Sequence, residues 1–312
     1  MIDIVLPWLN GNDKHWQNDY MSTVSKISGG DKGIIRVREW DIFKYFLRSI
    51  AKNCKFVRKI HIIVYDEHQI PDWINTSNDK INFVLHKDII PTEFLPTYNS
   101  LVPAMFVTNI KDLAENFIYC NDDMFFVNEM KEEDFFINEK PVKLLNKLTR
   151  KESRYWEFHD TWCRIMQNTI EIYNKLFSTN TLYEAPHVPT PYRKKDYIKC
   201  FGMLKPFHKQ LFGNFNDKIR QPNNLCMAEF VEYYESDFTD TEKLNNYRNL
   251  HQLINITEKP DWNKIFYALL NAKTICFNDQ CHTTNNMIFN DIKTKLIKTL
   301  NSVFPDKCEF EK

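Results

Sequence analysis

The segment Phe117-Ile118-Tyr119-Cys120-Asn121-Asp122-Asp123 passes abruptly from an apolar run to three polar residues. A short apolar run of this kind predicts a buried strand, and ligands of open α/β sheets bind at the carboxyl ends of such strands. Two adjacent carboxylates there suit a divalent cation or a general base. A polar turn leading to a further strand at residues 125–127 explains the same residues equally well.

Three segments upstream also have the apolar or β-branched character of buried strands, at residues 2–6, 57–65 and 81–85. Apolar residues at spacings of three and four predict a helix over 36–52, and another helix is expected over 101–114. The alternation of strands and helices predicts an α/β fold with a Rossmann-like (GT-A-like), mostly parallel sheet in the N-terminal half, residues 1–130.

The second half of the chain, residues 131–312, has a different pattern and is expected to be mainly helical and packed on the sheet. A Pro-rich connection is predicted at 178–194. The predicted helices are a long one containing Trp156 and Tyr173, then 225–236, 242–256, 260–272 and 290–302. The last of these spaces Ile292, Leu296 and Leu300 at steps of four, beside lysines. It is either an interfacial membrane helix or a helix packed on its own protein.

Composition excludes several classes of protein. The 312 residues contain 41 Lys+Arg and 41 Asp+Glu, and this zero net charge argues against a nucleic-acid partner. Only six glycines are present, which argues against a Gly-fingerprint nucleotide fold. The eight cysteines include no CxxC pair. Cys276 and Cys281 are therefore expected to be reduced thiols, and no metal is expected at these two residues and their neighbour His282. No signal peptide or membrane span is predicted, so we expect a soluble, cytoplasmic protein.

Three further groups of residues carry possible chemistry. Asp3, Asn10 and Gly11 surround the end of the first strand, where a buried carboxylate needs a partner, although Asp3 is also compatible with an edge position or a helix cap. His187 lies on a loop stiffened by three prolines and is a candidate base or phosphate contact, unless it is simply solvated. Arg220 is either a bidentate phosphate clamp or a surface charge.

Taken together, these segments resemble the Stealth family of sugar-1-phosphate transferases, which includes bacterial capsule enzymes and the animal GlcNAc-1-phosphotransferase. The resemblance covers about residues 2–280 and is most specific in the second conserved region of the family. It is carried by Ile2 to Asp13, by Arg36 and Asp41 leading into Phe46-Leu47-Arg48-Ser49-Ile50, by Ile70 to Asn75, Leu95 to Ser100, Phe117 to Phe125 and Pro186 to Pro189, by Ile219-Arg220 through Phe230, and by Cys276 to Asp279.

The resemblance implies a hexose-1-phosphate transferase that forms phosphodiesters in capsular or surface polysaccharide (exopolysaccharide) synthesis. The expected donor is a nucleotide sugar, UDP-linked, bound by residues 1–130, and the acceptor is an oligo- or polysaccharide. Active-site positions fall on Asp123, His187 and Arg220. Asp122 and Asp123 are the expected ligands of Mg²⁺ or Mn²⁺. The nucleotide-sugar pocket is expected to include Asp3, Asn10, Gly11, Arg36 and Asn121.

One departure from the family pattern concerns Ala104, near which the family carries an acidic residue. Two other functions remain open. The first is a metal-dependent nucleotide-sugar glycosyltransferase, which releases a nucleoside diphosphate rather than a monophosphate. The second is a non-catalytic carbohydrate-binding protein that uses its many aromatic rings. The general base, which is Asp122, Asp123 or His187, also stays open, and so does a peripheral contact with the inner face of the membrane.

Overall fold

A five-stranded sheet forms the centre of the computed structural model, which describes residues 1–32, 36–207 and 213–312. Its strand order is β10-β4-β1-β2-β3. The strands β1 (Ile2–Pro7), β2 (Val57–Val64), β3 (Ile81–Leu85) and β4 (Asn116–Tyr119) run parallel, and β10 (Thr190–Arg193) pairs antiparallel with β4. The predicted α/β fold with a mostly parallel sheet is confirmed.

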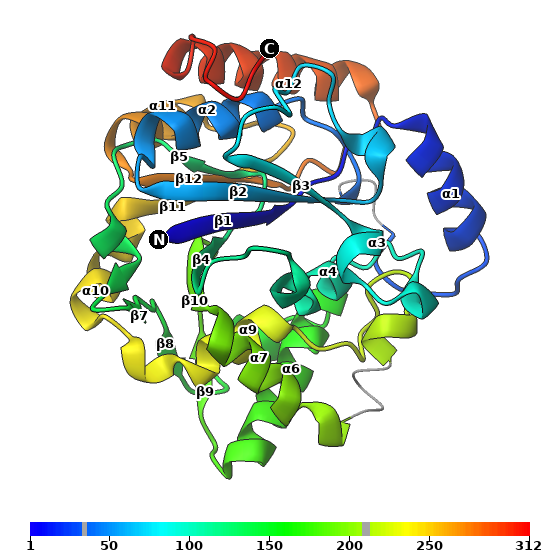
Figure 1. The fold of residues 1–312 in the computed structure, drawn as a ribbon, viewed down its shortest axis with the longest axis vertical. Coiled ribbons are helices and arrows are strands. Elements are labelled where there is room, and N and C mark those ends of the chain that lie inside the picture. The colour runs from blue at the N-terminus through cyan, green and yellow to red at the C-terminus, as the bar shows by residue number, and fades with distance from the viewer. Residues whose placement is uncertain (33–35, 208–212) are drawn as a thin grey trace.

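Each face of this sheet is covered by a layer of helices, as expected for strands buried on both sides. Ile4 and Leu6 of β1 face a core shared with α2 (Phe43–Asn53), α11 (Trp262–Asn271) and α12 (Asn286–Val303). Val5 faces the opposite core, shared with α4 (Leu101–Met105), α6 (Thr161–Phe177), α7 (Lys194–Met203) and α9 (Met227–Tyr234). Figure 1 shows the two layers above and below the sheet.

The predicted helices correspond to these elements with some changes of boundary. The helix predicted over 36–52 begins only at Phe43, because Asp41 has a positive φ of 55°, which an α-helix does not allow. The helix predicted over 101–114 ends at Met105 and is followed by a 3-10 turn, Val107–Asn109. Shorter helices are α1 (Lys14–Val24), α3 (His86–Ile89) and α5 (Arg154–Glu157).

Two predictions for the second half were wrong. The segment 242–256 is not one helix: α10 (Thr241–Leu250) is followed by a strand, β11 (His251–Ile256). This strand pairs with β12 (Thr274–Asp279), which pairs with β5 (Met124–Phe126), so neighbouring strands override the local helical pattern. The predicted Pro-rich connection contains β9 (Leu182–Glu184) and β10. A small hairpin joins β6 (Phe136–Ile137) to β7 (Lys140–Pro141). A separate two-stranded antiparallel sheet pairs β8 (Asn146–Leu148) with β9, although α5 and α6 lie between them in the chain.

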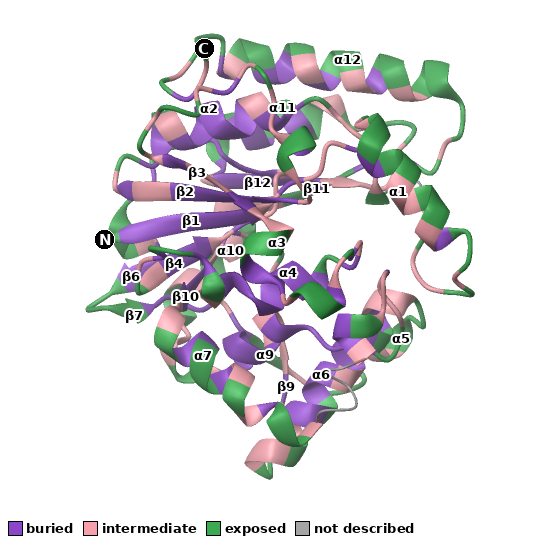
Figure 2. Ribbon diagram, turned by 45° about the vertical axis from the view of Figure 1, so that its right-hand side comes forward, coloured by how far each residue is buried: buried purple, intermediate pink, exposed green. Residues whose placement is uncertain are grey.

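The last helix is packed on its own protein. Ile292, Leu296 and Leu300 of α12 are buried in the core beside α2 and α11, so the apolar face of this helix is covered (Figure 2). Over the described residues, the chain has no helix that combines the length and the apolar character needed to span a bilayer.

Candidate active site

The polar turn after β4 lies at the carboxyl end of the parallel strands, where α/β folds bind ligands. The backbone N–H of Phe277 in β12 donates to the Asp123 carbonyl oxygen at 2.9 Å and fixes the turn. Asp123 Oδ1 is buried and has no hydrogen-bond partner among the described residues. Burial raises the pKa of Asp123, and burial together with the charges of Asp123 and Glu39 raises the pKa of Asp122. Among the described residues neither carboxylate forms an ion pair with lysine or arginine, although the charge of His187 opposes the raised pKa of Asp123.

His187 reaches this turn from the loop between β9 and β10. The side-chain amide nitrogen of Asn121 lies 3.4 Å from His187 Nε2. The His187 side chain is exposed, yet neighbouring protein atoms displace part of its hydration and lower its pKa, and the nearby Asp123 opposes this shift. The structure thus brings together three residues that the sequence places in one site: Asn121, Asp123 and His187.

Two residues beside this group, Cys276 and Glu39, are not among the site residues predicted from the sequence. One carboxylate oxygen of Asp123, one ring nitrogen of His187 and the thiol sulfur of Cys276 all lie within 4.8 Å of one another. The second residue is Glu39, whose charge raises the pKa of Asp122 and whose own pKa is raised by burial to about 7. Cys276 lies within β12, a strand that the sequence pattern does not predict, and Glu39 lies in a segment predicted to be helical.

Arg36 and Arg220 share a single carboxylate. Arg220 Nη2 lies 2.7 Å from Asp31 Oδ2, and Arg36 Nε lies 3.0 Å from the same oxygen. Burial and the charge of Arg36 lower the pKa of Arg220, which shows that the two cations repel each other across Asp31. Two guanidinium groups held by one carboxylate carry an excess positive charge, and such a pair can accept a phosphate group.

Gly11 sets the position of the segment that carries Arg36 and Glu39. A Cβ atom at Gly11 would lie 1.6 Å from the Val37 carbonyl oxygen, so only glycine permits this close approach. The neighbouring Asn10 is held from the other side, because its N–H donates to Gln69 Oε1 at 2.6 Å. These two residues therefore fix backbone at the end of β1, and no side-chain contact of theirs with Asp123 is observed within the described residues.

Asp3 lies at the opposite end of β1 from this site. Its carboxylate is fully buried and accepts hydrogen bonds from Arg58 Nε at 2.9 Å and from the Ala114 N–H at 2.8 Å, with His61 Nε2 at 3.0 Å. Against the effect of burial, these partners hold the pKa of Asp3 well below its usual range. The geometry makes Asp3 a framework residue that joins β1 to β2, and we no longer place it in the nucleotide pocket.

Ala104 lies in α4 and is 6% exposed, and its carbonyl oxygen accepts a hydrogen bond from the Tyr197 hydroxyl at 2.7 Å. The family's acidic side chain is therefore absent from this helix. Glu39 is the additional carboxylate that lies beside Asp122 instead.

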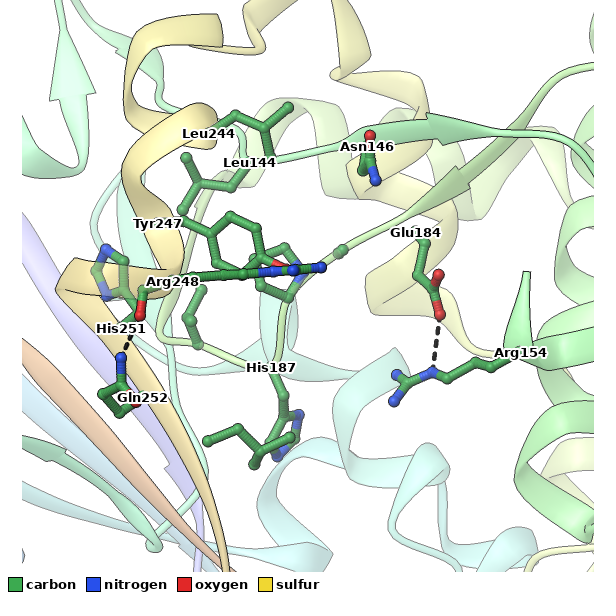
Figure 3. Close-up of a pocket in the computed structure, with 14 residues that line it drawn as sticks. Leu144, Asn146, Arg154, Glu184, His187, Leu244, Tyr247, Arg248, His251 and Gln252 are labelled. Atoms are coloured by element: carbon green, nitrogen blue, oxygen red, sulfur yellow. Dashed lines mark hydrogen bonds and ion pairs between the residues drawn. The ribbon is translucent and has the colours of Figure 1, made fainter. Parts of the chain in front are cut away.

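A cavity of about 420 Å³ opens next to His187, as Figure 3 shows. Arg154 and Arg248 extend into it from opposite sides, and His187 lies at one end. Arg154 Nε forms an ion pair with Glu184 Oε1 at 2.8 Å. The lining is completed by side chains from α10, β11 and the segments 144–146 and 185–188.

Comparison with known proteins gives one family match and several full-length relatives. Residues 36–144 match the family model described as Stealth protein CR2, conserved region 2. The capsular polysaccharide phosphotransferase WcwK of Streptococcus pneumoniae is 28% identical over 100% of this chain and 98% of its own length. The exopolysaccharide phosphotransferase cps2G of Lactiplantibacillus plantarum is 26% identical over 100% of this chain and 96% of its own length.

Solved structures that resemble the chain include two glycosyltransferases. The galactosyltransferase LgtC, in complex with donor and acceptor sugar analogs, is 10% identical with a TM-score of 0.38 and covers 94% of this chain and 95% of its own. Mouse xyloside xylosyltransferase 1 is 9% identical with a TM-score of 0.38 and covers 91% of this chain and 100% of its own. The chain carries conserved region 2 of the Stealth proteins, and the resemblance to the Stealth family that its sequence predicts is confirmed.

Proposed function

We propose that this protein is a sugar-1-phosphate transferase of capsular or surface polysaccharide synthesis. The donor is a nucleotide sugar, expected to be UDP-linked, and the acceptor is a saccharide hydroxyl. The acceptor oxygen forms a bond to the phosphorus that carries the sugar, and the bond from this phosphorus to the bridging oxygen of the pyrophosphate breaks. The nucleoside monophosphate leaves, the acceptor proton passes to a base on the enzyme, and the product is a phosphodiester.

The observation that carries this proposal is the meeting of Asn121, Asp123 and His187 at the carboxyl end of β4. A neutral imidazole has one unprotonated ring nitrogen that can take the acceptor proton, and the lowered pKa of His187 favours the neutral form. Arg220, with Arg36, would neutralise the donor phosphates, which is the main requirement of phosphoryl transfer. The names of the full-length relatives, all phosphotransferases of capsular or exopolysaccharide, agree with this assignment.

The residues at the turn fit a divalent cation. Asp123 Oδ1 is buried and has no hydrogen-bond partner in the part of the chain that the structure describes, and the mutual repulsion of Asp122, Asp123 and Glu39 would be relieved by a positive ion. Mg²⁺ or Mn²⁺ would be held by the oxygens of Asp122 and Asp123, since hard ions prefer oxygen ligands. A cation bound there supplies charge neutralisation for the pyrophosphate.

The competing function is a nucleotide-sugar glycosyltransferase, which breaks the bond between the anomeric carbon and oxygen. Phosphorus NMR of a reaction with nucleotide sugars and oligosaccharide acceptors distinguishes the two functions. A phosphodiester signal and nucleoside monophosphate support the transferase, whereas nucleoside diphosphate without a phosphodiester supports the competitor. Activity that is lost in excess chelator and restored by Mg²⁺ or Mn²⁺ supports the cation, and full activity in chelator contradicts it.

The shared role of Asp123 and His187 is tested by a double-mutant cycle. We expect Asp123→Asn and His187→Ala each to reduce turnover at least about a hundredfold, because loss of one transition-state contact costs roughly 3 kcal/mol. The double variant should be little worse than either single variant, since residues that act in one step are not additive. Losses that multiply independently would separate the two residues, and a lowered melting temperature would make the affected residue structural.

A further inference from the structure

The cavity beside His187 has a lining that the proposed transfer step leaves unused. It holds about 420 Å³, enough for a sugar unit with a charged substituent, and is formed mainly by α10, β11 and the loop before β10. His187 belongs both to this lining and to the Asn121–Asp123 group, so the cavity adjoins the proposed site of transfer.

The charge of the cavity favours an anion. Arg154 is neutralised by Glu184, whereas Arg248 has no carboxylate at ion-pair distance among the described residues. The neighbour of Arg248 is the Tyr247 hydroxyl oxygen, which accepts from Nε at 3.1 Å and leaves the remaining guanidinium N–H groups free for a ligand. Figure 3 shows the Arg248 guanidinium in the middle of the cavity, facing the side from which Arg154 enters.

The remaining lining suits a saccharide. The Tyr247 ring and the apolar side chains of Leu144, Pro186 and Leu244 offer a surface for the C–H face of a sugar. Asn146 and Gln252 supply amide groups that can pair with hydroxyls. A lining that combines an aromatic ring, amides and one unpaired guanidinium matches a sugar that carries a phosphate better than it matches a neutral sugar.

We propose that this cavity is the acceptor subsite, and that it binds a phosphate group carried by the acceptor saccharide between Arg248 and Arg154. The proposal rests on the proposed function, because the phosphodiester product of one transfer is itself such an anionic saccharide. Two sources of the phosphate share this chemistry: a phosphodiester within the growing polymer, and the pyrophosphate of a lipid carrier.

Binding of small probes in the presence of an unreactive donor analogue tests the proposal. The probes for isothermal titration are a methyl hexoside, the corresponding hexosyl methyl phosphodiester, and a hexosyl pyrophosphate with a short alkyl tail. We expect at least one charged probe to bind the wild-type protein about tenfold more tightly than the neutral hexoside. Tighter binding of the diester identifies the polymer as the source, and tighter binding of the pyrophosphate identifies the lipid carrier.

Arg248→Gln should remove the preference for the charged probe, and Arg248→Lys should keep part of it. Arg248 is exposed on α10, so the melting temperature should not change. Lys298→Gln removes one exposed positive charge on α12, outside the cavity lining, and is the matched control. Equal affinity for neutral and charged probes, or an Arg248→Gln protein with wild-type preference, would overturn the proposal.

Two results separate this proposal from the proposed function. An Arg248→Gln protein that binds the nucleotide-sugar donor tenfold more weakly would assign the cavity to the donor and overturn the acceptor subsite alone. Conversely, Arg248-dependent binding of the diester in a protein that forms no phosphodiester by phosphorus NMR would leave the subsite standing and remove the transferase.

Discussion

At the scale of single residues, Arg58 has two carboxylate neighbours, Asp3 and Asp112, whose removal should have unequal effects on stability. Asp3→Asn takes the charge from a fully buried site and leaves Arg58 without its closest partner. We expect a loss of about 3–5 kcal/mol in the free energy of unfolding at pH 7, measured with urea. The control is Asp112→Asn, the other carboxylate beside Arg58, which is 57% exposed. Its loss should be below about 1 kcal/mol.

The same residue predicts a dependence on acid. The folded-state pKa of Asp3 lies below its unfolded value, so its contribution to stability is complete above the unfolded pKa. That contribution is lost as the pH falls through the folded-state pKa. Equal losses for the Asp3 and Asp112 variants at pH 7 would contradict the assignment of Asp3 to the framework.

Cys276 gives a prediction about inhibition. Zn²⁺ binds carboxylate, imidazole and thiolate together, whereas Mg²⁺ prefers oxygen ligands only. Because Asp123, His187 and Cys276 present all three donors within 4.8 Å, we expect Zn²⁺ to inhibit an enzyme that is activated by Mg²⁺. Cys276→Ser should raise the inhibitory Zn²⁺ concentration at least about tenfold while keeping the Mg²⁺-dependent rate. Cys308→Ser is the control, and inhibition that is unchanged in Cys276→Ser refutes the prediction.

At the scale of elements, α9 carries a buried acidic row. Burial raises the pKa of Glu232 and of Glu235 to about 7, although Lys143 opposes both shifts, and Lys143 Nζ lies 2.8 Å from Glu235 Oε2. An acid whose pKa is raised on folding binds more protons when folded, so stability falls as the pH rises from about 4.5 to 7.

Glu232→Gln should flatten this fall. The shift from 4.5 to about 7 corresponds to about 3 kcal/mol for the group, an upper value because Glu229 shares its environment. Urea unfolding at pH 5 and pH 8 measures the difference for wild type and variant. Glu242→Gln, at an exposed position in α10, should leave the wild-type pH dependence unchanged. A variant with the same slope as wild type would show that Glu232 is already ionised at pH 5.

The elements also show how far sequence patterns lead. The strands β1 to β4 were predictable because apolar or β-branched residues dominate each of these short segments, and β3 has the predicted boundaries of Ile81 and Leu85. The strand β11 was not, since its six residues continue the pattern of α10 and only pairing with β12 selects the extended form. Short edge elements such as β9 and β10 depend on partners far along the chain, which local spacing does not encode.

At the scale of the whole molecule, the candidate site is assembled from distant segments. The carboxylates after β4 could be predicted because a strand end is visible in the sequence. The meeting of Asp123 with His187 was expected from family resemblance alone. Packing brings together segments that are up to about 190 residues apart in the chain. It places Arg36 and Arg220 on the same Asp31 carboxylate and Cys276 near Asp123 and His187. A local sequence pattern does not predict such contacts.

The strand β10 has a consequence for synthesis of the chain. It completes the main sheet beside β4, yet it follows β4 by about 70 residues. At a translation rate of roughly 5–20 residues per second, the β4 edge emerges from the ribosome several seconds before its partner exists. An unpaired strand edge can form hydrogen bonds with other chains and so promote aggregation. The nascent protein therefore passes through an interval in which its sheet is open on the side that will carry the active site, and shielding of this edge by a chaperone would improve its yield.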